Sequence, residues 1–176
     1  DGEIVLPPTE TTQPTETTKP TETEPPVEST NPNEPTGTKI VIAAKVGEDY
    51  YAMSNTFTGK ISGTVIPVTD GKVSGDDAGA YAVILTQVSG GYTIYANGNY
   101  LTYKSNTNFG TSAEPYVWVL SAGVNGSSRL TASADAKRGI VFRGGTYNQF
   151  GAYSVSNAEA GSTEYFDVEL LPIEGE

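Results

Sequence analysis

The sequence predicts an all-β protein, and three observations support this fold class: short apolar runs, frequent turn residues and an internal repeat. The chain of 176 residues contains 20 glycines and 11 tyrosines. Glycine suits turns, whereas tyrosine suits half-buried strands. From Lys39 onward, apolar runs alternate with glycine and asparagine turns, and helical spacing of apolar residues does not persist. We therefore expect strands to dominate the folded part.

Ten strands are predicted between residues 39 and 171. They cover residues 39–44, 49–55, 64–68, 80–88, 91–96, 100–104, 116–121, 129–133, 139–143 and 165–171. The step from YTIYA to NYLTY passes through Asn97 and Gly98. An Asn-Gly pair supplies the positive φ angles of a type I′ turn, so this step predicts a tight hairpin.

The strands recur in a threefold order. Each unit has a strand, a tight turn, a second strand, a variable stretch and a strand led by tyrosine, which makes Tyr81, Tyr116 and Tyr165 equivalent. Three such units fit a β-trefoil-like barrel, in which six strands form the barrel and three hairpins cap it. Two stacked antiparallel sheets would give the same strand spacing, so a β-sandwich is the alternative.

Residues 1–38 differ in composition from the rest of the chain. PTETTQ, PTETTK and PTETEP follow one another from Pro8 to Pro25 and offer no apolar residue to bury. Such a segment cannot offset its ordering entropy. We expect a disordered Pro/Thr/Glu-rich linker over residues 1–38 and a single binding module over residues 39–176. The chain also starts without a methionine, and we expect it to be part of a longer protein.

Composition excludes several kinds of chemistry. The chain has no cysteine and no histidine, which removes disulfides, thiol catalysis, thiolate metal sites and imidazole bases. Its acid pairs lie in glycine-flanked turns, which lack the apolar enclosure that a general acid needs. The segment DGKVSGDD, residues 70–77, does not have the spacing of an EF-hand, although a looser oxygen-rich site stays open. We expect no enzyme activity, no cofactor and no bound metal.

The net charge also bears on the partner. Most of the formal charge of −11 belongs to the linker, and residues 39–176 are only mildly acidic. A surface that neutralises a nucleic-acid backbone is therefore not favoured. No apolar run approaches the length needed to cross a bilayer, so we expect no membrane span.

The best candidate binding segment is FRGGTYNQFGAYS, residues 142–154. Gly144 and Gly145 permit a sharp reversal that would place Tyr147, Asn148 and Gln149 at a loop tip. Amide groups beside aromatic rings suit sugar hydroxyls, and nearby basic residues would equally suit phosphate or carboxylate. The candidate ligand-binding residues are Arg143, Tyr147, Asn148, Gln149 and Tyr153, with Tyr100 and Tyr103 of the strand NYLTYKS as a second set.

Each candidate has a purely structural interpretation. In the 142–154 segment, Asn148 and Gln149 would bond the loop backbone while Phe150 and Tyr153 fill the end of the barrel. Trp118 is the only tryptophan, and a lone tryptophan can serve as a sugar platform. It stands in a strand two residues after Tyr116, however, and we expect it in the core.

Four segments carry a resemblance to a known family: IVIAAKVGEDYYAMSN, SAGVNGSSRLTAS, RGIVFRGGTYNQFGAYS and EYFDVELLPI. Over residues 39–173 the chain resembles an accessory β module near the C-terminus of large extracellular proteins of gut Firmicutes and, more distantly, Bacteroidetes. There the module follows surface nucleases, glycoside hydrolases or starch-adherence proteins. The resemblance implies a module without catalysis, at an extracellular or cell-surface location, and implies no particular ligand.

These observations lead to one expected function and two alternatives. We expect a non-catalytic accessory module of a secreted multi-domain bacterial protein that binds a glycan or polysaccharide, with other modules of the same chain as further partners. The first alternative is a structural or protein-interaction module that spaces or anchors an attached enzyme. The second is nucleic-acid binding through the arginines near residue 143.

Overall fold

The computed structural model describes residues 34–176, and residues 1–33 of the predicted linker lie outside this range. Residues 34–37 have no regular secondary structure. The Thr36 carbonyl nevertheless accepts a hydrogen bond from the Thr86 hydroxyl at 2.9 Å, and the first strand begins at Thr38. The folded part therefore starts slightly before the predicted boundary at Lys39.

Residues 34–176 form fourteen β-strands and three short 3₁₀ turns, without an α-helix in this range. The strands are β1 (Thr38–Val46), β2 (Asp49–Met53), β3 (Ile61–Ile66), β4 (Ala82–Val88), β5 (Gly91–Ala96), β6 (Asn99–Ser105), β7 (Asn108–Ser112), β8 (Trp118–Ala122), β9 (Ser128–Ala132), β10 (Asp135–Gly139), β11 (Val141–Arg143), β12 (Gln149–Gly151), β13 (Tyr165–Phe166) and β14 (Glu169–Pro172). The predicted all-β class is confirmed.

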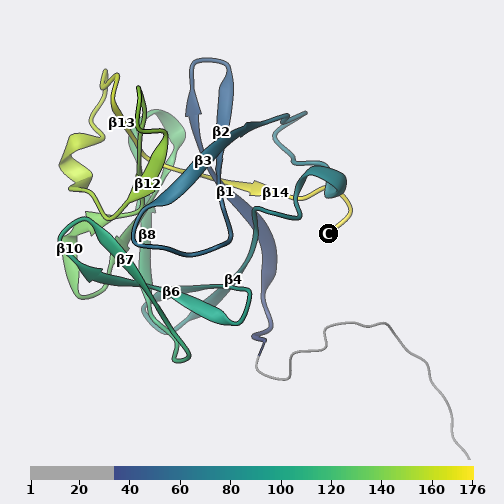
Figure 1. Ribbon diagram of the computed structural model, residues 1–176, viewed down its shortest axis with the longest axis vertical. Coiled ribbons are helices and arrows are strands. Elements are labelled where there is room, and N and C mark those ends of the chain that lie inside the picture. The colour runs from purple at the N-terminus through teal and green to yellow at the C-terminus, as the bar shows by residue number, and fades with distance from the viewer. Residues whose placement is uncertain (1–33) are drawn as a thin grey trace, which may run out of the picture. The chain divides into compact units, whose positions relative to one another are not determined.

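The antiparallel strand pairings form one curled sheet (Figure 1). β1 pairs with β4, β4 with β5, β5 with β8, and β8 with β9. At the start of β9, Ser128 exchanges two backbone hydrogen bonds of 2.7 and 3.0 Å with Val168. β14 follows directly and pairs with β1, with Ile40 opposite Pro172. The remaining strands extend from this ring, mostly as hairpins.

The Asn-Gly hairpin predicted between the two strands of the YTIYANGNYLTY segment is present. β5 and β6 pair up to Ala96 and Asn99, which leaves Asn97 and Gly98 as the two turn residues. Their φ angles are +51° and +86°, the positive values that a type I′ turn requires. Local sequence chemistry is sufficient to specify this turn.

β1 is buried on both faces, which explains its unbroken apolar run. Ile40, Ile42 and Ala44 belong to the main core, whereas Val41 and Ala43 belong to a second cluster that includes one residue of β14, Leu171. Successive side chains of a strand point to opposite faces. A strand covered on both sides therefore has no position for a polar residue between Ile40 and Ala44.

The main core contains Trp118, whose side chain is fully buried. Its indole N–H donates to the Leu101 carbonyl at 2.9 Å. The ring meets Phe109 and Tyr116 edge-on, at centroid distances of 6.0 and 5.4 Å. The expectation that Trp118 belongs to the core is confirmed, and it has no exposed face to offer a sugar.

The strand prediction needs two kinds of correction. β7, β10 and β12 were not predicted, and the predicted strand 139–143 is divided between the end of β10 and β11. The predicted strand 165–171 is divided because its pairing partner changes. Residues 165–166 pair with β11, Val168 pairs with Ser128, and residues from Glu169 onward pair with β1. Apolar periodicity does not reveal such a change of partner.

Candidate ligand-binding site

The 142–154 segment forms a short hairpin between β11 and β12. Within its turn, Gly145 has a φ of +70° and Asn148 a φ of +44°, in the left-handed region that glycine and asparagine tolerate best. The predicted reversal is therefore present. Gln149 was expected at the tip, but it belongs to β12 and pairs with Arg143 across the hairpin.

Arg143 is held by side chains of its own neighbourhood. Its guanidinium lies 3.7 Å from the ring centroid of Tyr147 and 5.4 Å from that of Tyr165. Its Nε donates to Glu164 Oε2 at 2.7 Å, and this hydrogen bond raises the pKa of Arg143. The arginine thus already has a carboxylate partner, while the Tyr147 side chain remains 50% exposed.

The other residues of this segment support the hairpin. The Gln149 side-chain amide donates to the Tyr153 hydroxyl at 2.7 Å, and Tyr153 is only 6% exposed and packs edge-on against Tyr165. The Asn148 backbone carbonyl accepts from the Gly63 N–H at 2.9 Å. These contacts fit the structural interpretation, although Gln149 bonds a side chain rather than the predicted loop backbone.

The second set of candidates lies on β6, and its two tyrosines have different surroundings. Tyr100 packs edge-on against Tyr95, at a centroid distance of 5.0 Å. Tyr103 is half-buried and packs against the main core. Leu101, between them, is fully buried. The tyrosines therefore do not form one platform, and Tyr103 borders a surface groove that Tyr100 does not.

This groove, called here the β6–β7 groove, has a volume of about 840 Å³ and is lined by residues 57–59, 102–105 and 108–111. Two half-buried rings, Phe57 and Tyr103, both pack on the main core and also face the groove. Thr102, Thr111 and Asn108 add hydroxyl and amide groups. The volume is within the range of small-molecule sites, which combine apolar walls with a few polar groups.

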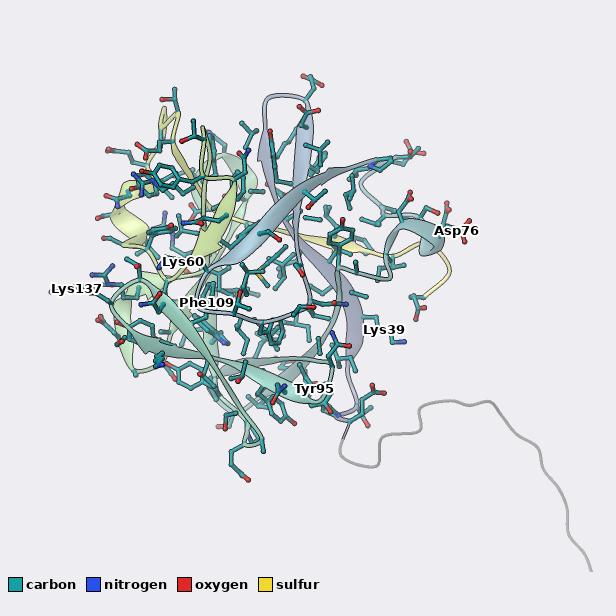
Figure 2. The ribbon with its side chains drawn as sticks, in the orientation of Figure 1. Lys39, Lys60, Asp76, Tyr95, Phe109 and Lys137 are labelled. Atoms are coloured by element: carbon teal, nitrogen blue, oxygen red, sulfur yellow. The ribbon has the colours of Figure 1, made fainter. Side chains whose placement is uncertain are left out.

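Backbone and side-chain contacts fix the two walls of the groove against each other. The Phe109 N–H donates to the Gly59 carbonyl at 2.9 Å, and the Lys60 ammonium donates to Asn108 Oδ1 at 2.7 Å. Figure 2 shows Lys60 and Phe109 next to each other where the 57–60 segment meets β7. Within its own segment, the Thr58 hydroxyl donates to the Lys60 carbonyl. The walls of the groove are therefore held in place by contacts within the protein itself.

Sequence reasoning identified Tyr103 but missed Phe57 and Asn108. Phe57 lies outside every predicted strand, and Asn108 begins a strand that was not predicted. Lys60 and Asn108 are 48 residues apart in the sequence, so no local pattern joins them. The available signal was the turn-rich stretch SNTNFG, in which Asn106 adopts a φ of +57° and turns β6 into β7.

Two of the basic residues near the 142–154 segment, Arg129 and Arg138, make contacts that hold the folded structure together. The Arg129 guanidinium binds Asp167 through Nε–Oδ1 and Nη2–Oδ2 contacts of 2.9 and 2.8 Å, and this carboxylate raises the pKa of Arg129. Asp167 also accepts from the Val124 N–H at 3.2 Å. Arg138 donates to the Ala152 carbonyl at 3.4 Å. An anion site built from these arginines would compete with existing contacts.

The 70–77 segment has a structure of its own. Thr69 and Lys72 exchange backbone hydrogen bonds of 3.0 Å around a tight turn, and Ser74 caps a 3₁₀ turn at Gly75–Asp77. Within residues 34–176, no group of three or more Asp or Glu is arranged to hold a metal ion. The same range contains no helix with the length and apolar character that a bilayer-spanning helix requires.

Comparison of the chain with protein-family models finds no match, and comparison with curated proteins finds none either.

Proposed function

We propose that residues 39–176 form a non-catalytic accessory module that binds a glycan or polysaccharide, and that the β6–β7 groove holds the sugar. The observation that carries the proposal is the lining of this groove. Phe57 and Tyr103 offer apolar ring surface, and Thr102, Thr111 and Asn108 offer hydrogen-bonding groups beside it. Sugars present the complementary pattern, since apolar ring faces alternate with hydroxyls.

The β6–β7 groove is a better site than the 142–154 hairpin. In the hairpin, Arg143 stacks on Tyr147 and bonds Glu164, while Gln149 bonds Tyr153. A ligand there would first have to displace those contacts, and each lost hydrogen bond reduces the net gain of binding. In the groove, the contact with Lys60 uses only the amide oxygen of Asn108, and the ring and hydroxyl side chains are part of the groove lining.

The proposed fold is a β-trefoil. The ring of pairings through β1, β4, β5, β8, β9 and β14 supports it, since a trefoil barrel has six strands. Burial at the positions that the repeat equates also supports it. Val83, Trp118 and Asp167 are all buried, and the tyrosines two residues earlier in each repeat are all half-buried. The β6–β7 groove then lies on the hairpin of the second repeat.

The proposed setting is a secreted multi-domain bacterial protein, in which this module would keep an attached enzyme close to its polymer. The sequence resemblance supports this setting. The alternative of a spacing or anchoring module would leave the groove without a ligand. Both interpretations predict the same fold, so they separate only through a binding measurement.

The test is retention of the full chain on a panel of immobilised polysaccharides. We expect retention on at least one of them, and we expect Asn108→Ala and Thr102→Val each to weaken it by about two- to tenfold, the effect of one lost hydrogen bond. The matched controls are Thr64→Val, an exposed β3 threonine outside the groove, and Tyr147→Ala at the hairpin tip. Thermal unfolding of every variant confirms that it is folded.

Two outcomes would contradict the proposal. The first is the absence of retention on every polysaccharide, which favours the spacing module. The second is loss of retention in Tyr147→Ala with full retention in Asn108→Ala and Thr102→Val, which moves the site to the 142–154 hairpin.

A further inference from the structure

The β6–β7 groove differs in charge from the rest of the folded part. Residues 39–176 contain thirteen Asp or Glu and nine Lys or Arg, yet the eleven residues that line the groove include Lys104 and no carboxylate. A positively charged lining on an acidic domain focuses attraction for anions at that place. The positive charge of the groove is therefore a local feature that would act on a ligand bound there, and it does not follow from the net charge of the protein.

A second ammonium stands at the margin of the groove. Lys60 Nζ lies 2.7 Å from Asn108 Oδ1, and its stem runs beside Gly151, where a Cβ atom would lie 3.0 Å from Lys60 Cδ. Among residues 34–176, the ion pairs are Arg129–Asp167 and Arg143–Glu164. Lys60 and Lys104 thus have no carboxylate partner within this described part of the chain.

The contact between Lys60 and Asn108 also determines how the amide faces. A lysine ammonium can only donate a hydrogen bond, so the Asn108 oxygen must turn toward it. The Asn108 NH₂ group, a donor, is therefore directed away from Lys60. At Gly110, a Cβ atom would come within 2.7 Å of the Thr102 hydroxyl and 3.3 Å of Lys104 Cβ. The missing side chain keeps Thr102 and Lys104 accessible together.

The charged and amide side chains at the groove therefore donate hydrogen bonds rather than accept them: the Lys104 ammonium in the lining, the Lys60 ammonium at the margin and the Asn108 NH₂ group, beside hydroxyls that can do either. A neutral sugar offers donors and acceptors in balance, whereas a sugar with a carboxylate or sulfate offers an excess of charged acceptors. We propose that the β6–β7 groove selects an acidic oligosaccharide, with Lys60 and Lys104 facing its anionic groups. This inference rests on the proposed function, because it specifies the class of sugar that the same groove takes.

The test compares matched ligands by titration calorimetry with the full chain. The probes are an oligogalacturonate, its fully methyl-esterified form and a sulfated galactan oligomer of equal length, with single-stranded DNA as a phosphate polymer. We expect at least one of the two acidic oligomers to bind about tenfold more tightly than the methyl ester. This preference should shrink when salt is added, since exposed charges are screened.

Lysine variants test whether Lys60 and Lys104 cause the preference for the acidic oligomer over the ester. Lys60→Gln and Lys104→Gln should each lower affinity for the acidic oligomer by about two- to fivefold, as expected for exposed charge pairs, and should lower affinity for the ester by less, because the ester carries no charge for either lysine to face. The matched control is Lys72→Gln, a lysine of the tight turn at residues 69–72, outside the groove. If only the oligogalacturonate or only the sulfated galactan oligomer is preferred, the result identifies carboxylate or sulfate as the anionic group that the groove binds.

Three results would overturn the inference, and they differ in what they say of the proposed function. Equal binding of the acid and the ester removes the charge selection but leaves sugar binding intact. Binding of DNA with the same dependence on Lys60 and Lys104, without binding of any sugar, assigns the groove to phosphate polymers. Binding of none of the probes, together with no retention on any polysaccharide, removes both proposals.

Discussion

The ion pair between Arg129 and Asp167 gives the sharpest prediction on stability. The Asp167 side chain is only 1% exposed and that of Arg129 is 23% exposed. The carboxylate accepts two short bonds from the guanidinium and a third from the Val124 N–H. Asp167→Asn keeps the shape of the side chain but removes its charge, which leaves the guanidinium largely buried without a counter-ion.

The expected cost follows from this burial. Breaking a buried ion pair by removing one partner costs about 3 to 5 kcal/mol, and partial exposure of Arg129 places this case near 3 kcal/mol. The surface pair is the matched control. Glu164 bonds Arg143 at a similar distance but has a 47% exposed side chain, so Glu164→Gln should cost much less than Asp167→Asn.

The assay is urea unfolding followed by far-ultraviolet circular dichroism, with the free energy of unfolding extrapolated to water. A third variant, Arg129→Met with Asp167→Leu, replaces both charges with apolar side chains. This double variant should be more stable than Asp167→Asn, because it leaves no charge unpaired. The reasoning is refuted if Asp167→Asn and Glu164→Gln cost the same, or if the double variant is the least stable of the three.

Two further predictions concern the core and the pH dependence of stability. Trp118→Phe removes the indole N–H that the Leu101 carbonyl accepts, and leaving a buried carbonyl unpaired should cost about 1 to 3 kcal/mol in urea unfolding; an unchanged unfolding midpoint would place the indole in contact with water. Burial raises the pKa of Glu169 above its ordinary value of 4.5, against an opposing effect of Lys45. Its contribution to stability is therefore full below that value and is lost as the pH rises through the raised folded-state pKa. Glu169→Gln, which cannot ionise, should be more stable than the natural chain at neutral pH and equal to it below pH 4.5. Unfolding curves at the two pH values that show the variant to be less stable at neutral pH would contradict this explanation.

Features that depend on neighbouring residues were predictable from the sequence. The Asn97–Gly98 turn needs only two residues that tolerate positive φ, and the structure has it. The burial of Trp118 followed from its strand and its size. The all-β class followed from short apolar runs, and the reversal at residues 144–145 followed from two glycines.

Features that depend on distant residues were not predictable. The β6–β7 groove exists because the 57–60 segment lies against β7, and no sequence pattern carries that contact. Asp167 was aligned with Trp118 as a repeat position, but its burial requires Arg129 from another strand to compensate the charge. Gln149 was placed at a loop tip because nothing in its local sequence indicates that it pairs with Arg143.

The pairing of β1 with β14 has a mechanical consequence. Ile40 lies opposite Pro172 and Ala43 opposite Glu169, so the chain enters and leaves the domain at the same end of one antiparallel strand pair. Tension applied to the two ends would load the backbone hydrogen bonds of this pair one after another, as in a zipper, rather than all together in shear. Each such bond contributes only about 1 kcal/mol net in water. Under pulling, the two backbone bonds that Val73 makes with Pro172 and Glu174 should therefore break first, and β1 and β14 should then separate from each other one bond at a time.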